Sequence, residues 1–323
     1  MTVSVSVPTA PSLATPAQAD PAGVVAFVAA LVTQLADAWF LICLLSLSYW
    51  LAPRVTAEPR AVAATLLGLG FAALAASLGA KSVFTVPRPP GATAATPPAF
   101  LVSPLTELFR SVATSDGFGL PSGHATAAAA MYGGFAVFLD VGTRRGRWLA
   151  AGSVVVLVAG TRVVLGLHTV WQVVVGAVFG GVLLWAATRA ARPGSRLRPD
   201  RLFTGVTVVG LVALVVTTSR GHGEAAAVTA VAVGGGLAGA LVWRLHGRDD
   251  TPVGGVGAVV GLAFTAVPFG FAGVVANNGL PAAFPDTLGV RVAAATLGAA
   301  VAIAFVLLWP TLVGRLRRLS SRE

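Results

Sequence analysis

The feature that most constrains this chain is a series of apolar runs, most of them about twenty residues long, with the arginines concentrated between them. A helix needs about 20 apolar residues to cross the hydrocarbon core of a bilayer. Only 11% of the residues are charged, whereas about 25% is usual in a soluble domain. The sequence therefore predicts an all-α, polytopic membrane helical bundle. We expect membrane lipids as partners and no nucleic acid, because the net charge of +10 is dispersed between the apolar runs.

The apolar runs predict about nine transmembrane helices, at residues 27–52, 61–79, 123–139, 148–166, 171–189, 202–218, 225–243, 253–275 and 292–313. The first 23 residues contain no Lys or Arg and are rich in Ser, Thr, Pro and Ala, which favours a flexible N-terminal tail over residues 1–23. The spans after about residue 200 carry almost no ionisable side chains. We therefore expect a core that holds the chemistry at residues 24–190 and additional C-terminal transmembrane helices at residues 191–323.

Alternation of the predicted crossings sorts the 22 basic residues into two groups. Sixteen lie on the side of the C-terminus, and the other six are Lys81, Arg88, Arg110, Arg162, Arg220 and Arg291. Basic residues in short loops stay cytoplasmic. We therefore predict a multi-pass protein of the cell membrane with a cytoplasmic C-terminus, whose smaller basic group faces the extracytoplasmic side.

Three segments on the predicted outer side carry polar residues that this charge rule does not explain. The second span ends at Lys81, the only lysine, and Arg88 follows in a proline-rich stretch that leaves the helix in an extended path. The third span opens with Pro121-Ser122-Gly123-His124, and a tight hairpin between the fourth and fifth spans holds Arg162 and His168. Because the three segments emerge on one face, we expect three cations, two imidazoles and a helix N-terminus to converge there.

Such a group of residues suits a phosphate or a similar oxyanion. Backbone N–H groups at a helix start favour anions, arginine donates in a planar fork, and lysine provides a compact point charge. One histidine can attack phosphorus while the other protonates the leaving oxygen. The sequence shows no carboxylate cluster and no Cys/His ligand set, so we expect a reaction that needs no metal and no cofactor. Taken singly, a lone arginine or histidine here is more often a headgroup contact or a structural residue.

Together, the three segments resemble the signature of the type 2 phosphatidic acid phosphatase superfamily, which also includes the vanadium haloperoxidases. That signature is Lys, six residues and Arg-Pro; then Pro-Ser-Gly-His; then Ser-Arg, five residues, His, three residues and Asp. The chain reads Lys81-x6-Arg88-Pro89, Pro121-Ser122-Gly123-His124 and Thr161-Arg162-x5-His168-x3-Gln172. The resemblance covers about residues 24–190, so the phosphatase core would occupy the first five or six helices.

The resemblance implies an integral membrane phosphatase that hydrolyses a lipid phosphate or a (poly)prenyl diphosphate through a phosphohistidine intermediate. It implies that His168 is the nucleophile and that His124 is the acid that releases the alcohol. It also implies that the phosphate is held by Lys81, Arg88, Ser122, Gly123 and Arg162. Vanadate-dependent oxidation, the other activity of the superfamily, is disfavoured by the many spans and the lack of a soluble domain.

The chain departs from the signature at two positions. Thr161 replaces a serine and keeps the hydroxyl, whereas Gln172 stands where the family has an aspartate that orients the nucleophilic imidazole and stabilises its charge. Three acidic residues near the outer face are candidates for a substitute carboxylate: Asp116, ranked first by its proximity in the chain to the third span, Asp37 and Glu107. Asp37 lies in the first predicted span, where a buried carboxylate would demand a partner.

Gln172 and the four additional spans leave a second function open. On that hypothesis the chain is a lipid-phosphate binding or transport protein on the same scaffold, with weakened or lost catalysis. One further segment, residues 103–109, has the signals of a helix start. We expect a short helix there, on the membrane surface, that helps to admit a lipid.

Overall fold

The computed structural model describes residues 21–51, 55–192, 196–247, 251, 253–279 and 285–320. Within these ranges the regular structure is helical throughout, so the predicted all-α bundle is confirmed. The helices are α1 (Pro21–Thr33), η1 (Gln34–Ala36), α2 (Ala38–Leu51), α3 (Pro59–Phe84), α4 (Leu105–Ala113), α5 (Gly123–Phe138), α6 (Arg144–Val164), α7 (Val170–Ala191), α8 (Pro199–Ser219), α9 (Gly223–His246), α10 (Gly255–Asn278) and α11 (Leu288–Ser320). Most of the predicted tail, residues 1–20, lies outside the described residues, and α1 begins just before the predicted boundary at residue 24.

Each of the nine predicted spans coincides with a helix or with the pair α1 and α2, but length and apolarity alone do not give nine crossings. In the described part of the chain, seven helices are long and apolar enough to cross a membrane, namely α3 and α6 to α11. The pair formed by α1–η1 and α2 is bent by 47° and raises the number to eight if it counts as one span. The remaining helix, α5, has only 16 residues, fewer than the about 20 of a typical span.

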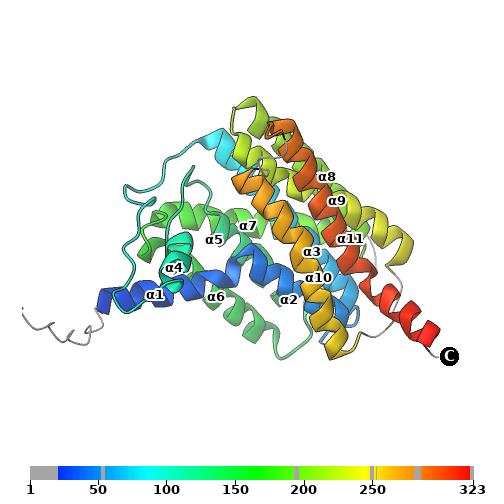
Figure 1. Ribbon diagram of the computed structural model, residues 1–323. Coiled ribbons are helices and arrows are strands. Elements are labelled where there is room, and N and C mark those ends of the chain that lie inside the picture. The colour runs from blue at the N-terminus through cyan, green and yellow to red at the C-terminus, as the bar shows by residue number, and fades with distance from the viewer. Residues whose placement is uncertain are drawn as a thin grey trace, which may run out of the picture.

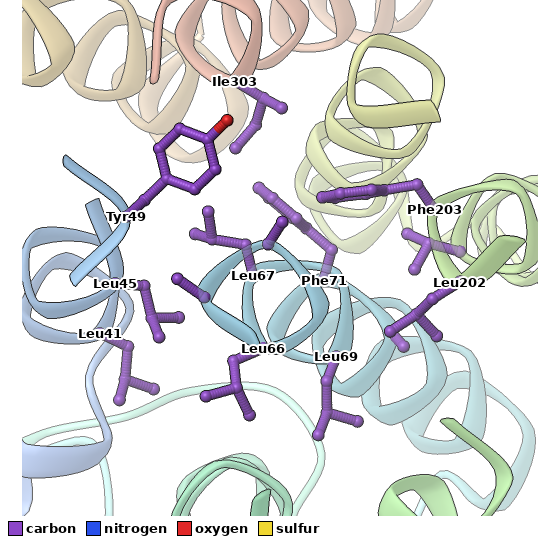
Figure 2. Packing of buried hydrophobic residues seen from close by; sticks show 14 of the residues in the cluster. Leu41, Leu45, Tyr49, Leu66, Leu67, Leu69, Phe71, Leu202, Phe203 and Ile303 are labelled. Atoms are coloured by element: carbon purple, nitrogen blue, oxygen red, sulfur yellow. The ribbon is translucent and has the colours of Figure 1, made fainter. Parts of the chain in front are cut away.

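Helix α3 lies at the centre of the bundle (Figure 1). The helices α5, α6 and α7 lie on one side of it with α1 and α4, and α8, α9 and α11 lie on the other. Figure 2 shows how side chains of α3 such as Leu67 and Phe71 lie among Phe203 of α8, Tyr49 of α2 and Ile303 of α11. One hydrophobic core therefore runs through both parts into which we divided the chain at residue 190.

Segments that the prediction assigns to the cytoplasmic side meet at one end of this bundle. The backbone N–H of Asp140, after α5, donates to the carbonyl of Val55, before α3, at 2.7 Å. The backbone N–H of Leu197, before α8, donates to the carboxylate of Glu58 at 3.1 Å. These contacts fit the predicted alternation of crossings; the identity of the cytoplasmic end stays a prediction from the charge distribution.

Candidate active site

The second predicted span continues further than expected, so Lys81 lies in the last turn of α3. The helix ends at Phe84 because the stretch that follows, Val86-Pro87-Arg88-Pro89-Pro90, contains three prolines, which lack amide protons and disfavour helical backbone in the residues before them. This stretch is held in place by the backbone N–H of Gly119, which donates to the carbonyl of Val86 at 2.7 Å. The ammonium of Lys81 lies 4.0 Å from the point where a Cβ would stand on Gly123. The first and second motifs therefore lie close together.

The N-terminus of α5 has the geometry of an anion site. Ser122 precedes the helix in an extended conformation, and its hydroxyl is buried with no hydrogen-bond partner among the described residues. The backbone N–H groups of the first turn of a helix lack intrahelical partners and attract negative charge. Helix α7 approaches this turn closely, because a Cβ on Gly176 would stand 2.7 Å from the carbonyl oxygen of Ser122. The small residue at position 176 thus lets α7 hold the start of α5 in place.

Gln172, in the first turn of α7, is only 1% exposed and its amide has a single possible orientation. Its Oε1 accepts from the backbone N–H of Thr169 at 3.1 Å, and its Nε2 donates to the backbone carbonyl of Pro87 at 2.9 Å. An N–H group only donates and a carbonyl only accepts, so these two backbone partners fix which end of the amide faces His168. That end is Oε1, 3.3 Å from Nδ1 of His168. The histidine must therefore carry its proton on Nδ1 when neutral, which leaves the lone pair on Nε2.

The side chain of Gln172 also explains a glycine in the loop before α5. A Cβ on Gly119 would stand 2.6 Å from Nε2 of Gln172 and 2.8 Å from its Oε1. Any larger residue at position 119 would therefore displace the amide that sets the tautomer of His168. No sequence pattern indicates this dependence, because the two residues are more than fifty positions apart.

Arg88 binds the other side of His168. Its NH1 lies 2.9 Å from Nε2 of His168 and donates to the carbonyl of Leu167 at 3.1 Å, while its Nε donates to the carbonyl of Asp116 at 2.7 Å. Burial lowers the pKa of His168 from 6.5 to about 2, and the charges of Arg88, Arg162 and Lys81 act in the same direction. His168 is therefore neutral at pH 7, with its Nε2 directed at the guanidinium of Arg88.

Arg162 and His124 complete the cluster, together with α1 and the break that follows it. Arg162 is 4% exposed, its NH1 donates to the hydroxyl of Thr33 at 3.2 Å, and its Nε is buried without a partner among the described residues. His124 lies with its Nε2 3.9 Å from the carboxylate of Asp37. Lys81 and Arg162 both act electrostatically on His124, so the three motifs form one site.

The three candidate carboxylates have different positions in the structure. Asp37 pairs with His124, whereas the negative charge of Asp116 acts on Lys81 and Arg88. Glu107 forms an exposed ion pair with Arg110 on α4. Among the described residues, no carboxylate forms an ion pair or hydrogen bond with His168, whose partner at Nδ1 is the amide of Gln172. Our ranking of Asp116 first is therefore not supported by any contact with a histidine, while Asp37 has one.

All the predicted site residues lie in one region, and the structure adds partners that the sequence did not indicate. These are the hydroxyl of Thr33, the carbonyl of Pro87 and the close approach of Gly119. Asp37 was recognisable only as a carboxylate inside an apolar run that needed a partner. Within the described residues no group of three or more His, Cys, Asp or Glu side chains is arranged to hold a metal ion. The catalytic and binding roles of the site residues stay predictions.

Residues 61–196 match the family model described as the PAP2 superfamily. This segment runs from α3 past the end of α7 and contains every predicted site residue. This match supports membership of the superfamily and confirms the recognition made from the three motifs. Membership supports phosphatase-type activity on phosphate esters, and the long apolar helices are those of a membrane protein. Searches of curated proteins and of solved structures found no match to the chain.

Proposed function

We propose that this protein is a membrane phosphatase that hydrolyses a lipid phosphate or a (poly)prenyl diphosphate through a phosphohistidine intermediate. The observation that carries the proposal is the state of His168: it is neutral, its Nδ1–H donates to Gln172, and its Nε2 lies against Arg88. A nucleophilic imidazole needs this protonation state and this tautomer.

In the proposed reaction the phosphate group occupies the space bounded by Lys81, Arg88 and Arg162, with further N–H donors from the start of α5. The Nε2 of His168 attacks phosphorus and forms a P–N bond while the bond to the leaving oxygen breaks. His124 gives a proton to that oxygen. Water then attacks phosphorus, His124 takes a proton from the water, and the P–N bond breaks to release phosphate. The three cations stabilise the charge on the phosphoryl oxygens throughout.

A lipid substrate is favoured by the surroundings of the site. Helix α4 begins at Leu105, where we expected a surface helix, and it packs through Phe109 and Ala113 against Leu165 of the hairpin that carries His168. Its outer face exposes apolar side chains, with Leu108 61% exposed. Exposed apolar residues beside a phosphate site suit a substrate whose chain stays in the bilayer. We propose that this face is extracytoplasmic, as the distribution of arginines predicts.

The test uses purified full-length protein in detergent or in lipid nanodiscs. We expect release of inorganic phosphate from a short-chain phosphatidate or from farnesyl diphosphate, and loss of release in His168→Ala. With methanol added, two substrates that differ in their leaving group should give the same ratio of methyl phosphate to phosphate, since both products arise from one phosphoenzyme. Ratios that depend on the leaving group would refute the intermediate. Release that persists in His168→Ala would refute the assigned nucleophile.

A second function is favoured by one observation: the partner of His168 is an amide that stabilises a cation far less than a carboxylate does. On this alternative the chain binds or transports a lipid phosphate, and hydrolysis is weak or lost. A comparison of wild type with Gln172→Asp distinguishes the phosphatase function from lipid-phosphate binding or transport. A wild type that binds lipid phosphate but releases none, together with a variant that gains turnover, supports binding or transport. Wild-type turnover that requires both His124 and His168 supports the phosphatase.

A further inference from the structure

The break in the first apolar segment, between α1 and α2, packs against the helices that form the site. Helix α1 ends at Thr33, η1 follows, and α2 leaves at an angle of 47°. The carbonyl of Leu35 in η1 accepts from the hydroxyl of Tyr132 on α5 at 2.8 Å. Ala36 is buried against Ala128 of α5 and Val158 of α6. These contacts fix the position of the break relative to the two helices that carry His124 and Arg162.

Two polar side chains of this break reach the site. The hydroxyl of Thr33, which is fully buried, accepts from NH1 of Arg162 at 3.2 Å. One carboxylate oxygen of Asp37 lies 3.9 Å from Nε2 of His124. Both residues precede residue 61, where the match to the family begins. The segment outside the family match therefore contributes contacts to both an arginine and a histidine of the site.

The surroundings of His124 determine how Asp37 affects the protonation of its imidazole. Burial opposes a positive charge on the imidazole, as do Arg162 from α6 and Lys81 from α3, and Asp37 is the group that favours it. A general acid must carry its proton when the leaving oxygen separates. An opposite charge within about 4–6 Å favours the protonated form of an imidazole.

We propose that Asp37 is a positioning residue for the general acid, and that its carboxylate favours the charged form of His124 against the burial of the imidazole and the two neighbouring cations. The proposal rests on the phosphatase function argued above. When the P–O bond breaks, the proton passes from His124 to the leaving oxygen while Asp37 stays ionised. Asp37 also precedes α2 and receives a hydrogen bond from the backbone of Ala38, so it has a second, structural role as a helix cap.

The substitution Asp37→Asn separates these two roles, because asparagine caps a helix as well as aspartate does but carries no charge. The probes are decyl phosphate, whose alkoxide leaves poorly and needs the acid, and 4-nitrophenyl phosphate, whose phenolate leaves easily. We expect kcat/KM of Asp37→Asn to fall about 10–100-fold for decyl phosphate and less than about threefold for 4-nitrophenyl phosphate. We also expect the alkaline limb of the rate for decyl phosphate to move down by about one pH unit or more.

Matched variants complete the experiment. Asp37→Glu keeps the charge and should restore part of the rate for decyl phosphate, whereas Asp37→Ser keeps only the cap and should not. Thr33→Val removes the hydrogen bond to Arg162 and should affect both substrates alike. Equal losses for the two substrates in Asp37→Asn, with an unmoved pH profile, would overturn the proposal and leave only the cap. If wild type hydrolyses neither probe and no lipid phosphate, it is the phosphatase function itself that fails.

Discussion

Gln172 offers the sharpest test of the site, because one buried amide connects three segments. Replacing it with methionine keeps nearly the same length and volume but removes the hydrogen bonds to His168, Thr169 and Pro87. Of the three partners, Nδ1 of His168 is in the buried interior, whereas Thr169 and Pro87 have access to solvent. The three losses therefore have unequal costs.

The expected cost follows from this difference in burial. A buried donor left without a partner costs about 1–3 kcal/mol, and a hydrogen bond that water replaces costs about 0.5–1 kcal/mol. One loss of the first kind and two of the second give about 2–5 kcal/mol of destabilisation for Gln172→Met. Turnover should fall about 10–100-fold, because a loss of about 1.4–2.7 kcal/mol in orienting the imidazole converts to that range.

The assays are unfolding in detergent, monitored by intrinsic tryptophan fluorescence, and phosphate release from phosphatidate. Gln172→Glu is the matched comparison, since a carboxylate keeps the acceptor for His168 and stabilises a charged imidazole while losing the donor to Pro87. We expect Gln172→Glu to have higher turnover than Gln172→Met. A methionine variant that is as stable and as active as wild type would show that the amide neither supports the fold nor orients His168.

Three further predictions concern other parts of the site. Arg88→Lys keeps the charge but loses the planar fork, so kcat/KM for phosphatidate should fall about 10–100-fold; an unchanged value would exclude a forked contact. Gly180→Ala places a Cβ 2.3 Å from the carbonyl oxygen of Thr126 and should destabilise the protein by about 1–3 kcal/mol in unfolding measurements, whereas Gly181→Ala, which meets no neighbour within 4 Å, should be neutral. Unfolding at several pH values tests His168: its pKa is about 2 in the folded state against 6.5, so the unfolded chain binds the proton first, and stability should fall by about 1.4 kcal/mol per unit as pH drops below 6.5. In His168→Gln this dependence should be smaller.

The convergence of the cationic and histidine motifs could be predicted from the sequence, because successive membrane crossings alternate in direction. Lys81, Ser122 and Arg162 belong to segments that end or begin on the same face once the crossings are counted, and the structure has them in one cluster. Length and apolarity also indicated the helical segments correctly. The number of crossings was harder to predict, since α5 is short and the first apolar segment is broken.

The hydrogen-bond and ion-pair partners of the site residues could not be predicted from the sequence. They depend on lateral packing between segments that are far apart in the chain. Asp116 is close to His124 in sequence, but its backbone contacts Arg88, whereas Asp37 reaches His124 from more than eighty residues away. In a bundle, helices pack according to their faces and small residues, so proximity in the chain is a poor guide to proximity in space. The orientation of the Gln172 amide likewise depended on a loop carbonyl that no motif identifies.

The structure gives the departure from the family signature a physical meaning. A neutral nucleophile needs an acceptor for Nδ1–H, and Gln172 provides one, held in the correct orientation by two backbone groups. What an amide does not provide is compensation for the positive charge that His168 acquires once it bears the phosphoryl group. In this site the carboxylate contact lies instead at His124, where we propose that it favours the charged form of the acid before the reaction begins. On the proposed mechanism we therefore expect the substitution to leave the nucleophile competent and to make its phosphorylated form less stable, so that the first chemical step has the larger barrier.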